Sequence, residues 1–207
     1  MSGEIRNIVF DIGNVLLSYD PMRTLHAAFR DEDTCHAVYN AVFCAPEWPL
    51  ADEGLVTEEE QILAAVRRAP QYEKEIRQIF AEWHLDLPEI EGMPELVKAL
   101  RESGYGIYVL SNFARRFYRI KDHDALFSLA DGILISSDHK LVKPFRAIYE
   151  LLLSKFSLRA EECLFIDDLE ENIYGARAAG LHGHRFTGCE ELRTWLRQEK
   201  LLPRTER

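Results

Sequence analysis

Short apolar runs alternate with longer segments of helical spacing over much of the 207-residue chain. Runs of apolar, β-branched and aromatic residues are typical of buried strands. This pattern predicts strands at 5–10, 106–110 and 163–166, and weaker candidates at 132–135 and 184–186. Proline at the start or glycine after the end marks most of the predicted helices, at 94–103, 144–156, 170–179 and 190–199. Strands that alternate with helices predict an α/β fold, with a parallel sheet flanked by helices.

Residues 18–90 have a different pattern, with helical spacing, charged surfaces and no convincing strand. Thr57-Glu-Glu-Glu60 matches a capping box, which marks the start of a helix. The helices expected in this part of the chain are 21–30, 33–43, 57–68 and 72–83. The segment 45–50 is interpreted as a loop that could close over a ligand. We therefore expect a small helical cap at 18–90, inserted after the first strand into a core formed by 1–17 and 91–207.

The acidity of the chain lies almost entirely in this predicted cap. The whole chain has 35 Asp and Glu against 25 Lys and Arg, and residues 18–90 hold 15 and 6 of these, so −9 of the net −10 belongs to the cap. A net negative charge argues against a protein that binds nucleic-acid phosphates or an anionic membrane surface. An acidic cap over an anion site must turn its charges away from the site. We therefore expect Glu58, Glu59 and Glu60 to point to solvent.

The remaining composition predicts a cytoplasmic protein without a structural metal. The first residues lack the basic and then apolar regions of a secretory signal, and no transmembrane segment is visible. A zinc site is not expected, because the four cysteines form no Cys-x-x-Cys pair. They are Cys35, Cys44, Cys163 and Cys189. Free thiols are typical of a reducing compartment.

Polar residues follow the predicted strands at the points where ligands bind in parallel sheets. These residues are Asp11, Ser111 with Asn112, Lys143 before a proline, and Asp167 with Asp168. Each has a purely structural alternative: a carboxylate that ends a strand, a serine or aspartate that caps a helix, or a solvated lysine. Two adjacent acids behind an apolar strand repel each other unless a cation is near, which favours a functional reading of the pair.

This set of side chains suits phosphoryl chemistry. Carboxylates from separate strands, Asp11 and Asp168, suit Mg²⁺, which takes few carboxylates together with water and substrate oxygens. A carboxylate can also attack phosphorus and form an aspartyl-phosphate. The charge of that reaction would be offset by Mg²⁺ and Lys143, while Ser111 and Asn112 would bind the phosphoryl oxygens.

At these motifs the sequence resembles the haloacid-dehalogenase-like (HAD) hydrolase superfamily. The resemblance rests on four motifs: Phe-Asp-Ile-Gly-Asn-Val-Leu, Leu-Ser-Asn-Phe, Val-Lys-Pro-Phe-Arg-Ala-Ile-Tyr and Leu-Phe-Ile-Asp-Asp-Leu-Glu-Glu-Asn. With the helical segment inserted after the first motif, it extends over nearly the whole chain. More narrowly, it is similar to the branch that contains a bacterial α-D-glucose-1-phosphate phosphatase, which shares the Asp-x-Gly-Asn-Val start and the Phe-x-Asp-Asp-x-x-x-Asn pattern. The resemblance implies a Rossmann-like core with a helical cap.

The resemblance also implies roles for individual residues. Asp11 would be the nucleophile and a magnesium ligand, together with the Gly13 carbonyl and Asp168. Asp167 would be a further ligand or would support the ligands, Ser111 would bind the phosphoryl group, and Lys143 would balance charge. Phosphatases of this superfamily usually carry a second Asp, a general acid, where this chain has Gly13.

Three explanations of that departure stay open at this point. The substrate could have a good leaving group, such as a sugar 1-phosphate; a cap residue, His84 or Asp86, could supply the proton; or turnover could be poor. The favoured function is therefore a Mg²⁺-dependent phosphatase of a small phosphorylated metabolite. The alternatives are a metal-independent 2-haloacid dehalogenase and a non-catalytic phosphate-binding module.

Overall fold

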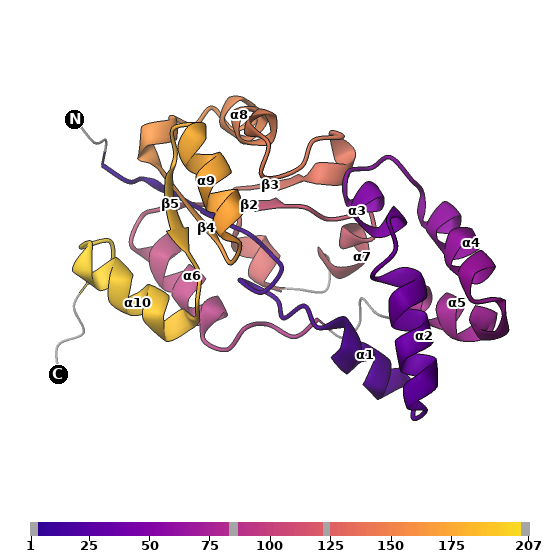
Figure 1. Ribbon diagram of the computed structural model, residues 1–207. Coiled ribbons are helices and arrows are strands. Elements are labelled where there is room, and N and C mark those ends of the chain that lie inside the picture. Colours follow the sequence, from indigo (N-terminus) through magenta and orange to yellow (C-terminus); the bar gives the residue numbers. More distant parts are fainter. Residues whose placement is uncertain (1–3, 83–86, 122–124, 204–207) are drawn as a thin grey trace.

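A computed structural model describes residues 4–82, 87–121 and 125–203 (Figure 1). Its centre is one five-stranded parallel sheet in the order β3-β2-β1-β4-β5, which confirms the predicted α/β fold. The strands are β1 (Asn7–Phe10), β2 (Gly106–Ser111), β3 (Gly132–Ile135), β4 (Cys163–Asp167) and β5 (His182–Arg185). All five lie at or close to the predicted positions.

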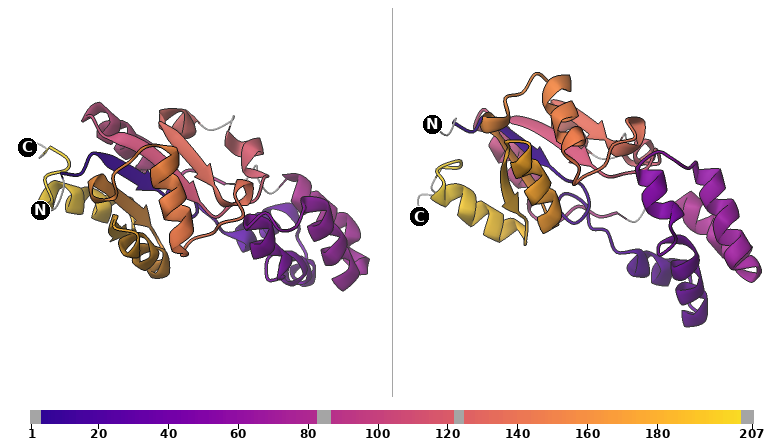
Figure 2. Two further views of the ribbon diagram at one scale, coloured as in Figure 1. Left: turned by 90° about the horizontal axis from the view of Figure 1, so that it is seen from above. Right: turned by 45° about the horizontal axis from the view of Figure 1, so that its top comes forward.

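Helices cover both faces of the sheet because the side chains on both sides of the central strands β1 and β4 are largely apolar. Ile8 and Phe10 of β1 pack toward α6 (Met93–Glu102) and α10 (Cys189–Gln198), whereas Val9 packs toward α8 (Arg146–Lys155) and α9 (Glu170–Ala178). Figures 1 and 2 show these two helical layers on either side of the strands.

The segment after β1 folds into helices packed around a separate apolar cluster, beside the sheet in Figure 2. These helices are α1 (Pro21–Ala28), α2 (Glu32–Val42), α3 (Glu47–Asp52), α4 (Glu58–Arg68) and α5 (Glu73–Glu82). The capping box at Thr57 is present at the start of α4, as the sequence predicts. No strand occurs in the described part of this segment.

The structure differs from the predicted elements in two places. Residues 45–50 do not form an open loop, because α3 begins at Glu47; its prolines lie before or within the first turn, where a missing N–H costs little. Helix α8 begins at Arg146 instead of 144, because Phe145 donates its N–H to the Val142 carbonyl in a turn.

Short helices that the sequence pattern did not predict connect the larger elements. They are α7 (Phe117–Lys121) and the 3₁₀ turns η1 (Pro70–Tyr72), η3 (Ala125–Leu129), η4 (Ser136–Asp138) and η5 (Ala160–Glu162). Among the described residues, no helix is both long and apolar enough to cross a membrane.

Candidate active site

The carboxyl ends of the three central strands bring the predicted residues together. Asp11 follows β1, Ser111 ends β2 and Asp167 ends β4, and β1 pairs with both neighbours. Asp11, Ser111 and Lys143 are almost fully buried. A cavity opens at this edge of the sheet, and Asp11, Gly13, Ser111, Asn112 and Lys143 all contribute to its lining.

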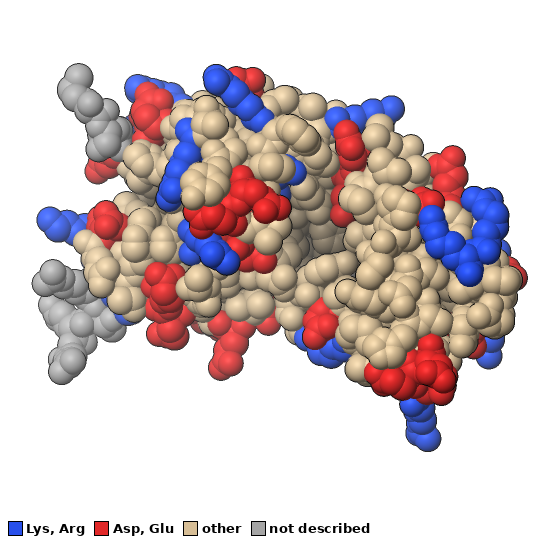
Figure 3. Space-filling model, viewed as in Figure 1, with Lys and Arg blue, Asp and Glu red and all other residues tan. Residues whose placement is uncertain are grey.

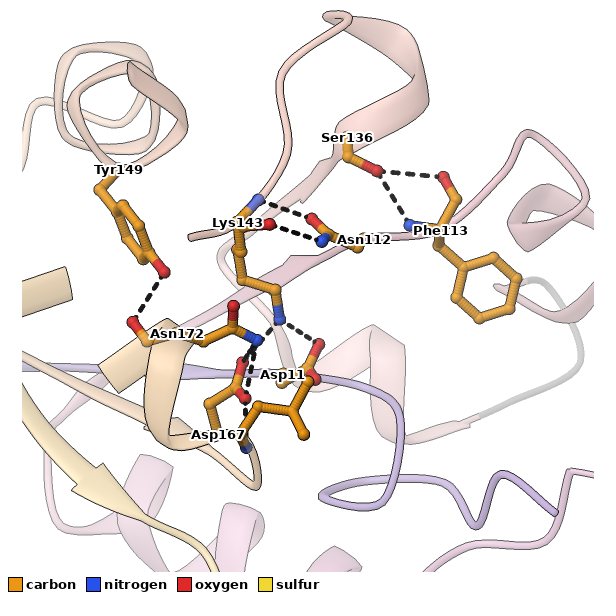
Figure 4. Close-up of polar contacts among 9 residues, drawn as sticks. Asp11, Asn112, Phe113, Ser136, Lys143, Tyr149, Asp167 and Asn172 are labelled. Carbon is orange, nitrogen blue, oxygen red and sulfur yellow. Dashed lines mark hydrogen bonds and ion pairs between the residues drawn. The ribbon is translucent and has the colours of Figure 1, made fainter. Parts of the chain in front are cut away.

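Lys143 connects two carboxylates at the base of the cavity. Its ammonium nitrogen lies 2.7 Å from Asp11 Oδ1 and 2.7 Å from Asp167 Oδ2 (Figure 4). Burial by itself would lower the pKa of Lys143, but the two neighbouring carboxylates raise it above its ordinary value. The lysine is therefore a fixed positive charge beside Asp11.

Asp167 is held by several donors besides this lysine. The Asn172 side-chain amide lies 3.0 Å from both carboxylate oxygens, and the Leu169 N–H donates to Oδ1 at 2.9 Å. Tyr149 in turn holds Asn172, because the Tyr149 hydroxyl donates to the backbone carbonyl of Asn172 at 2.8 Å (Figure 4). With its oxygens engaged in this way, Asp167 is well placed to orient Lys143.

Asn112 also contacts Lys143, through the lysine's backbone. Its side chain accepts from the Lys143 N–H at 2.8 Å and donates to the Lys143 carbonyl at 3.0 Å. The side-chain amide that the sequence suggested for phosphoryl binding therefore clamps the lysine segment against the end of β2. Asn112 nevertheless lines the cavity together with Ser111.

Three carboxylates gather where the sequence predicted a metal. One ligand oxygen from each of Asp11, Asp167 and Asp168 lies within 4.8 Å of the others. Burial, with the nearby Asp167 adding to it, raises the pKa of Asp11 to about 6 and raises that of Asp168. Three carboxylates facing one ammonium leave a local excess of negative charge, so this donor set fits a divalent cation with oxygen ligands.

Gly13 stands in a tight turn directly after the candidate nucleophile. The next residue, Asn14, has φ of +54°, and its N–H donates to the Leu17 carbonyl at 2.7 Å. A Cβ on Gly13 would have no atom within 4 Å, so packing does not require glycine there. His84 and Asp86, the predicted replacements for the missing acid, lie outside the described residues.

The outer half of the cavity contains residues that the sequence analysis did not assign. Tyr19, Trp48, Phe113 and Leu169 line it, and a buried Arg116–Asp52 pair joins α3 to the loop after β2. The signal was too weak to find them, because they come from four separate segments without a shared motif. Glu59 and Glu60 are exposed, as predicted, whereas Glu58 is half-buried and pairs with Arg119 at 2.6 Å; none of the three lines this cavity.

The fold and this cluster define an α/β protein with an acidic, lysine-containing site at the carboxyl edge of its sheet. The chain belongs to the haloacid dehalogenase-like hydrolases, because the model of that family matches residues 5–180. It is a hydrolase of this family, as the sequence motifs predicted.

Two of the relatives have phosphatase names. The chain is 25% identical over 190 residues to the sesquiterpene phosphatase astK of Aspergillus oryzae, covering 89% of this chain and 93% of that protein. It is 31% identical over 116 residues to a ribulose-1,5-bisphosphate 5-phosphatase of Halopiger xanaduensis, covering 54% of this chain and 48% of that protein.

Solved structures share the fold. A HAD family enzyme of Bacteroides thetaiotaomicron superposes with a TM-score of 0.72 at 21% identity, covering 94% of this chain and 99% of that one. The same enzyme has been solved with magnesium and inorganic phosphate, with a TM-score of 0.68 over 89% of this chain and 95% of that one.

Proposed function

We propose that the protein is a Mg²⁺-dependent phosphomonoesterase that forms an aspartyl-phosphate on Asp11. The observation that carries this proposal is the Lys143 ammonium, held 2.7 Å from Asp11 within a group of three carboxylates. A carboxylate next to a fixed positive charge supports the proposal, because nucleophilic attack on a phosphate needs positive charge close to the reacting atoms. The phosphatase names of relatives with different substrates support phosphoryl transfer as the shared chemistry.

Each residue of the site has a separate role in the proposed reaction. An Asp11 carboxylate oxygen attacks phosphorus as the bond from phosphorus to the ester oxygen breaks, and the departing alkoxide takes a proton from solvent water. A second water molecule then attacks phosphorus, the bond from phosphorus to the Asp11 oxygen breaks, and the proton of that water passes to solvent as phosphate is released. Lys143 and the Ser111 hydroxyl face the phosphoryl oxygens and stabilise their charge. Asp167 and Asn112 hold Lys143 in place through its side chain and its backbone.

Asp11, Asp168 and the Gly13 carbonyl are the groups that would hold Mg²⁺. The metal supplies positive charge to the phosphoryl group and offsets the repulsion between the carboxylates. A metal-independent dehalogenase gains nothing from three crowded acids, and a purely binding module gains nothing from a carboxylate aligned with a lysine. We also infer that residues 18–90 act as a cap that selects the ester group, with a sugar phosphate among the substrates to be tested.

The experiment is a phosphate-release assay on an aryl phosphate with Mg²⁺. We expect turnover by the wild type and a loss of at least ~10³-fold in Asp11→Asn, because the amide cannot form the acyl phosphate. Asp33→Asn, at an exposed position in α2, is the matched control and should retain activity. Unchanged phosphate release by Asp11→Asn would overturn the proposal, whereas chloride release from 2-chloropropionate without metal would favour the dehalogenase.

A further inference from the structure

The lining of the cavity becomes mainly apolar away from the end where the phosphoryl group would bind. Beyond Lys143 and Ser111 its surface is formed largely by the rings and chain of four residues, which we call the apolar wall. These are Tyr19, Trp48, Phe113 and Leu169. They come from the segment after β1, from α3, from the loop after β2 and from the start of α9. In Figure 3 the hollow between the sheet end and the cap helices is mostly tan, with few charged atoms.

Polar atoms in and behind this wall are engaged with one another. The Trp48 side chain hydrogen-bonds the Tyr19 phenol oxygen. The Arg116 guanidinium lies 3.9 Å from the Trp48 ring centroid and donates to Gln61 Oε1 at 3.0 Å. Its side chain is only 1% exposed, so it presents little of itself to the cavity.

Asp52, the remaining charged group of this region, is paired in the same way. Its carboxylate lies 3.5 Å from Arg116 Nη2 and accepts a hydrogen bond from the Ala114 N–H. Its backbone carbonyl accepts from the Ser136 hydroxyl. The polar groups of the wall therefore fix the wall itself, and what faces the ligand is mainly ring and aliphatic surface.

This arrangement discriminates between ester groups. A sugar carries several hydroxyls, and each one that leaves water without gaining a partner lowers affinity. An alkyl or aryl group gains roughly fourfold in affinity for each methylene that it buries. The apolar wall therefore favours an alkyl or aryl ester group over the sugar of the expected sugar phosphate.

We propose that the substrate is the monophosphate ester of an apolar alcohol, with its hydrocarbon part against the apolar wall. This inference rests on the proposed phosphatase function for the placement of the phosphate. It replaces the sugar phosphate with a hydrocarbon ester as the preferred substrate class. Leu169, which is 47% exposed, is the wall residue most open to an incoming chain.

The first test measures binding, so that it does not depend on turnover. Asp11→Asn protein with Mg²⁺ is titrated calorimetrically with n-octyl phosphate, glucose 1-phosphate and inorganic phosphate. We expect octyl phosphate to bind at least ~30-fold more tightly than glucose 1-phosphate, from the burial of several methylenes. Equal affinities, or tighter binding of the sugar ester, would overturn the inference.

The second test follows kcat/KM of the wild type on the same two esters and on acetyl phosphate. Octyl phosphate should exceed glucose 1-phosphate by a similar factor, and the reverse order would contradict the inference. If no ester and no acyl phosphate is hydrolysed, the proposed function fails, and the binding ratio still decides the substrate class.

A pair of variants locates the selectivity on the wall. Leu169→Gln should lower the affinity for octyl phosphate relative to inorganic phosphate by ~5–10-fold, because a polar amide replaces buried hydrocarbon. Leu63→Gln is the matched control, since Leu63 is 41% exposed on α4 and does not line the cavity. The affinity for octyl phosphate relative to inorganic phosphate must fall in Leu169→Gln and stay unchanged in Leu63→Gln. The same value in both variants would contradict a role for the apolar wall.

Discussion

The buried Asp52 carboxyl offers a quantitative test of the electrostatics at the cap boundary. Asp52 lies in α3, and its carboxylate contacts Arg116 and the Ala114 N–H and interacts electrostatically with the Tyr19 phenol group. Burial raises the pKa of Asp52 from 3.8 to about 7, although Arg116 and the Ala114 hydrogen bond act in the opposite direction. Burial likewise lowers the pKa of Arg116. Desolvation of both charges therefore outweighs their attraction.

The sign of the effect on stability follows from this shift. The folded protein binds the Asp52 proton more tightly than the unfolded chain, so its stabilising contribution is fully present below the unfolded pKa of 3.8 and is lost as the pH rises through about 7. A shift of roughly three units corresponds to about 4 kcal/mol in all, of which about 2–3 kcal/mol develops between pH 5 and pH 8.

Asp52→Asn removes the titrating carboxyl group. It keeps the size of the side chain and an oxygen that can accept a hydrogen bond from the Ala114 N–H. Its free energy of unfolding, relative to that of the wild type, should rise by about 2–3 kcal/mol between pH 5 and pH 8. Urea unfolding at four pH values in EDTA measures this difference, and carboxyls common to both proteins cancel. Asp33→Asn, which is exposed, should show a flat difference. If the free energy of unfolding of Asp52→Asn relative to wild type stays constant or falls between pH 5 and pH 8, the reasoning is refuted. The charged Asp52–Arg116 pair would then stabilise the folded protein.

Three further predictions concern the site and its support. EDTA should lower phosphate release by at least ~100-fold and added Mg²⁺ should restore it, since the carboxylates need a cation; activity that survives EDTA would contradict this. Gly175→Ala should lower the free energy of unfolding by about 1–3 kcal/mol in urea titrations, because its Cβ would lie 2.2 Å from the Pro144 carbonyl; a stabilised variant would refute the clash. Gly13→Asp has room for its side chain and should raise kcat for alkyl phosphates by ~10-fold or more, with less effect on aryl phosphates. Equal effects on both esters would exclude a general acid at position 13.

The sheet and the candidate catalytic cluster could be predicted because both depend on local sequence. Apolar runs mark β1, β2 and β4, and the polar residue at the end of each must meet its neighbours once the strands pair in parallel. The sequence therefore placed Asp11, Ser111 and Asp167 at one edge without any knowledge of contacts. Lys143 follows for the same reason, since its segment precedes α8 at that edge.

The outer cavity could not be predicted, because its contacts join distant parts of the chain. Arg116 and Asp52 are 64 residues apart, and either one alone has the appearance of a surface charge. Prolines at 46 and 49 favoured a loop where the structure has α3, because packing of Trp48 against Phe43 and Phe80 stabilises the helix. The clamp between Asn112 and Lys143 involves backbone groups, which leave no signature in side-chain type.

The acidity of the cap and the acidity of the site have different consequences. Among the described residues of the cap, most acidic side chains are exposed or paired outside the site, as in Glu58 with Arg119 and Glu47 with Arg68. Asp52 enters the cavity, but burial holds its proton to near neutral pH. The cap therefore adds little negative charge to the cavity, despite its net charge of −9. The repulsive charge there comes from Asp11, Asp167 and Asp168, which a single lysine cannot balance. A divalent cation offsets that excess, so the site should gain affinity for a phosphate ester only when metal is present.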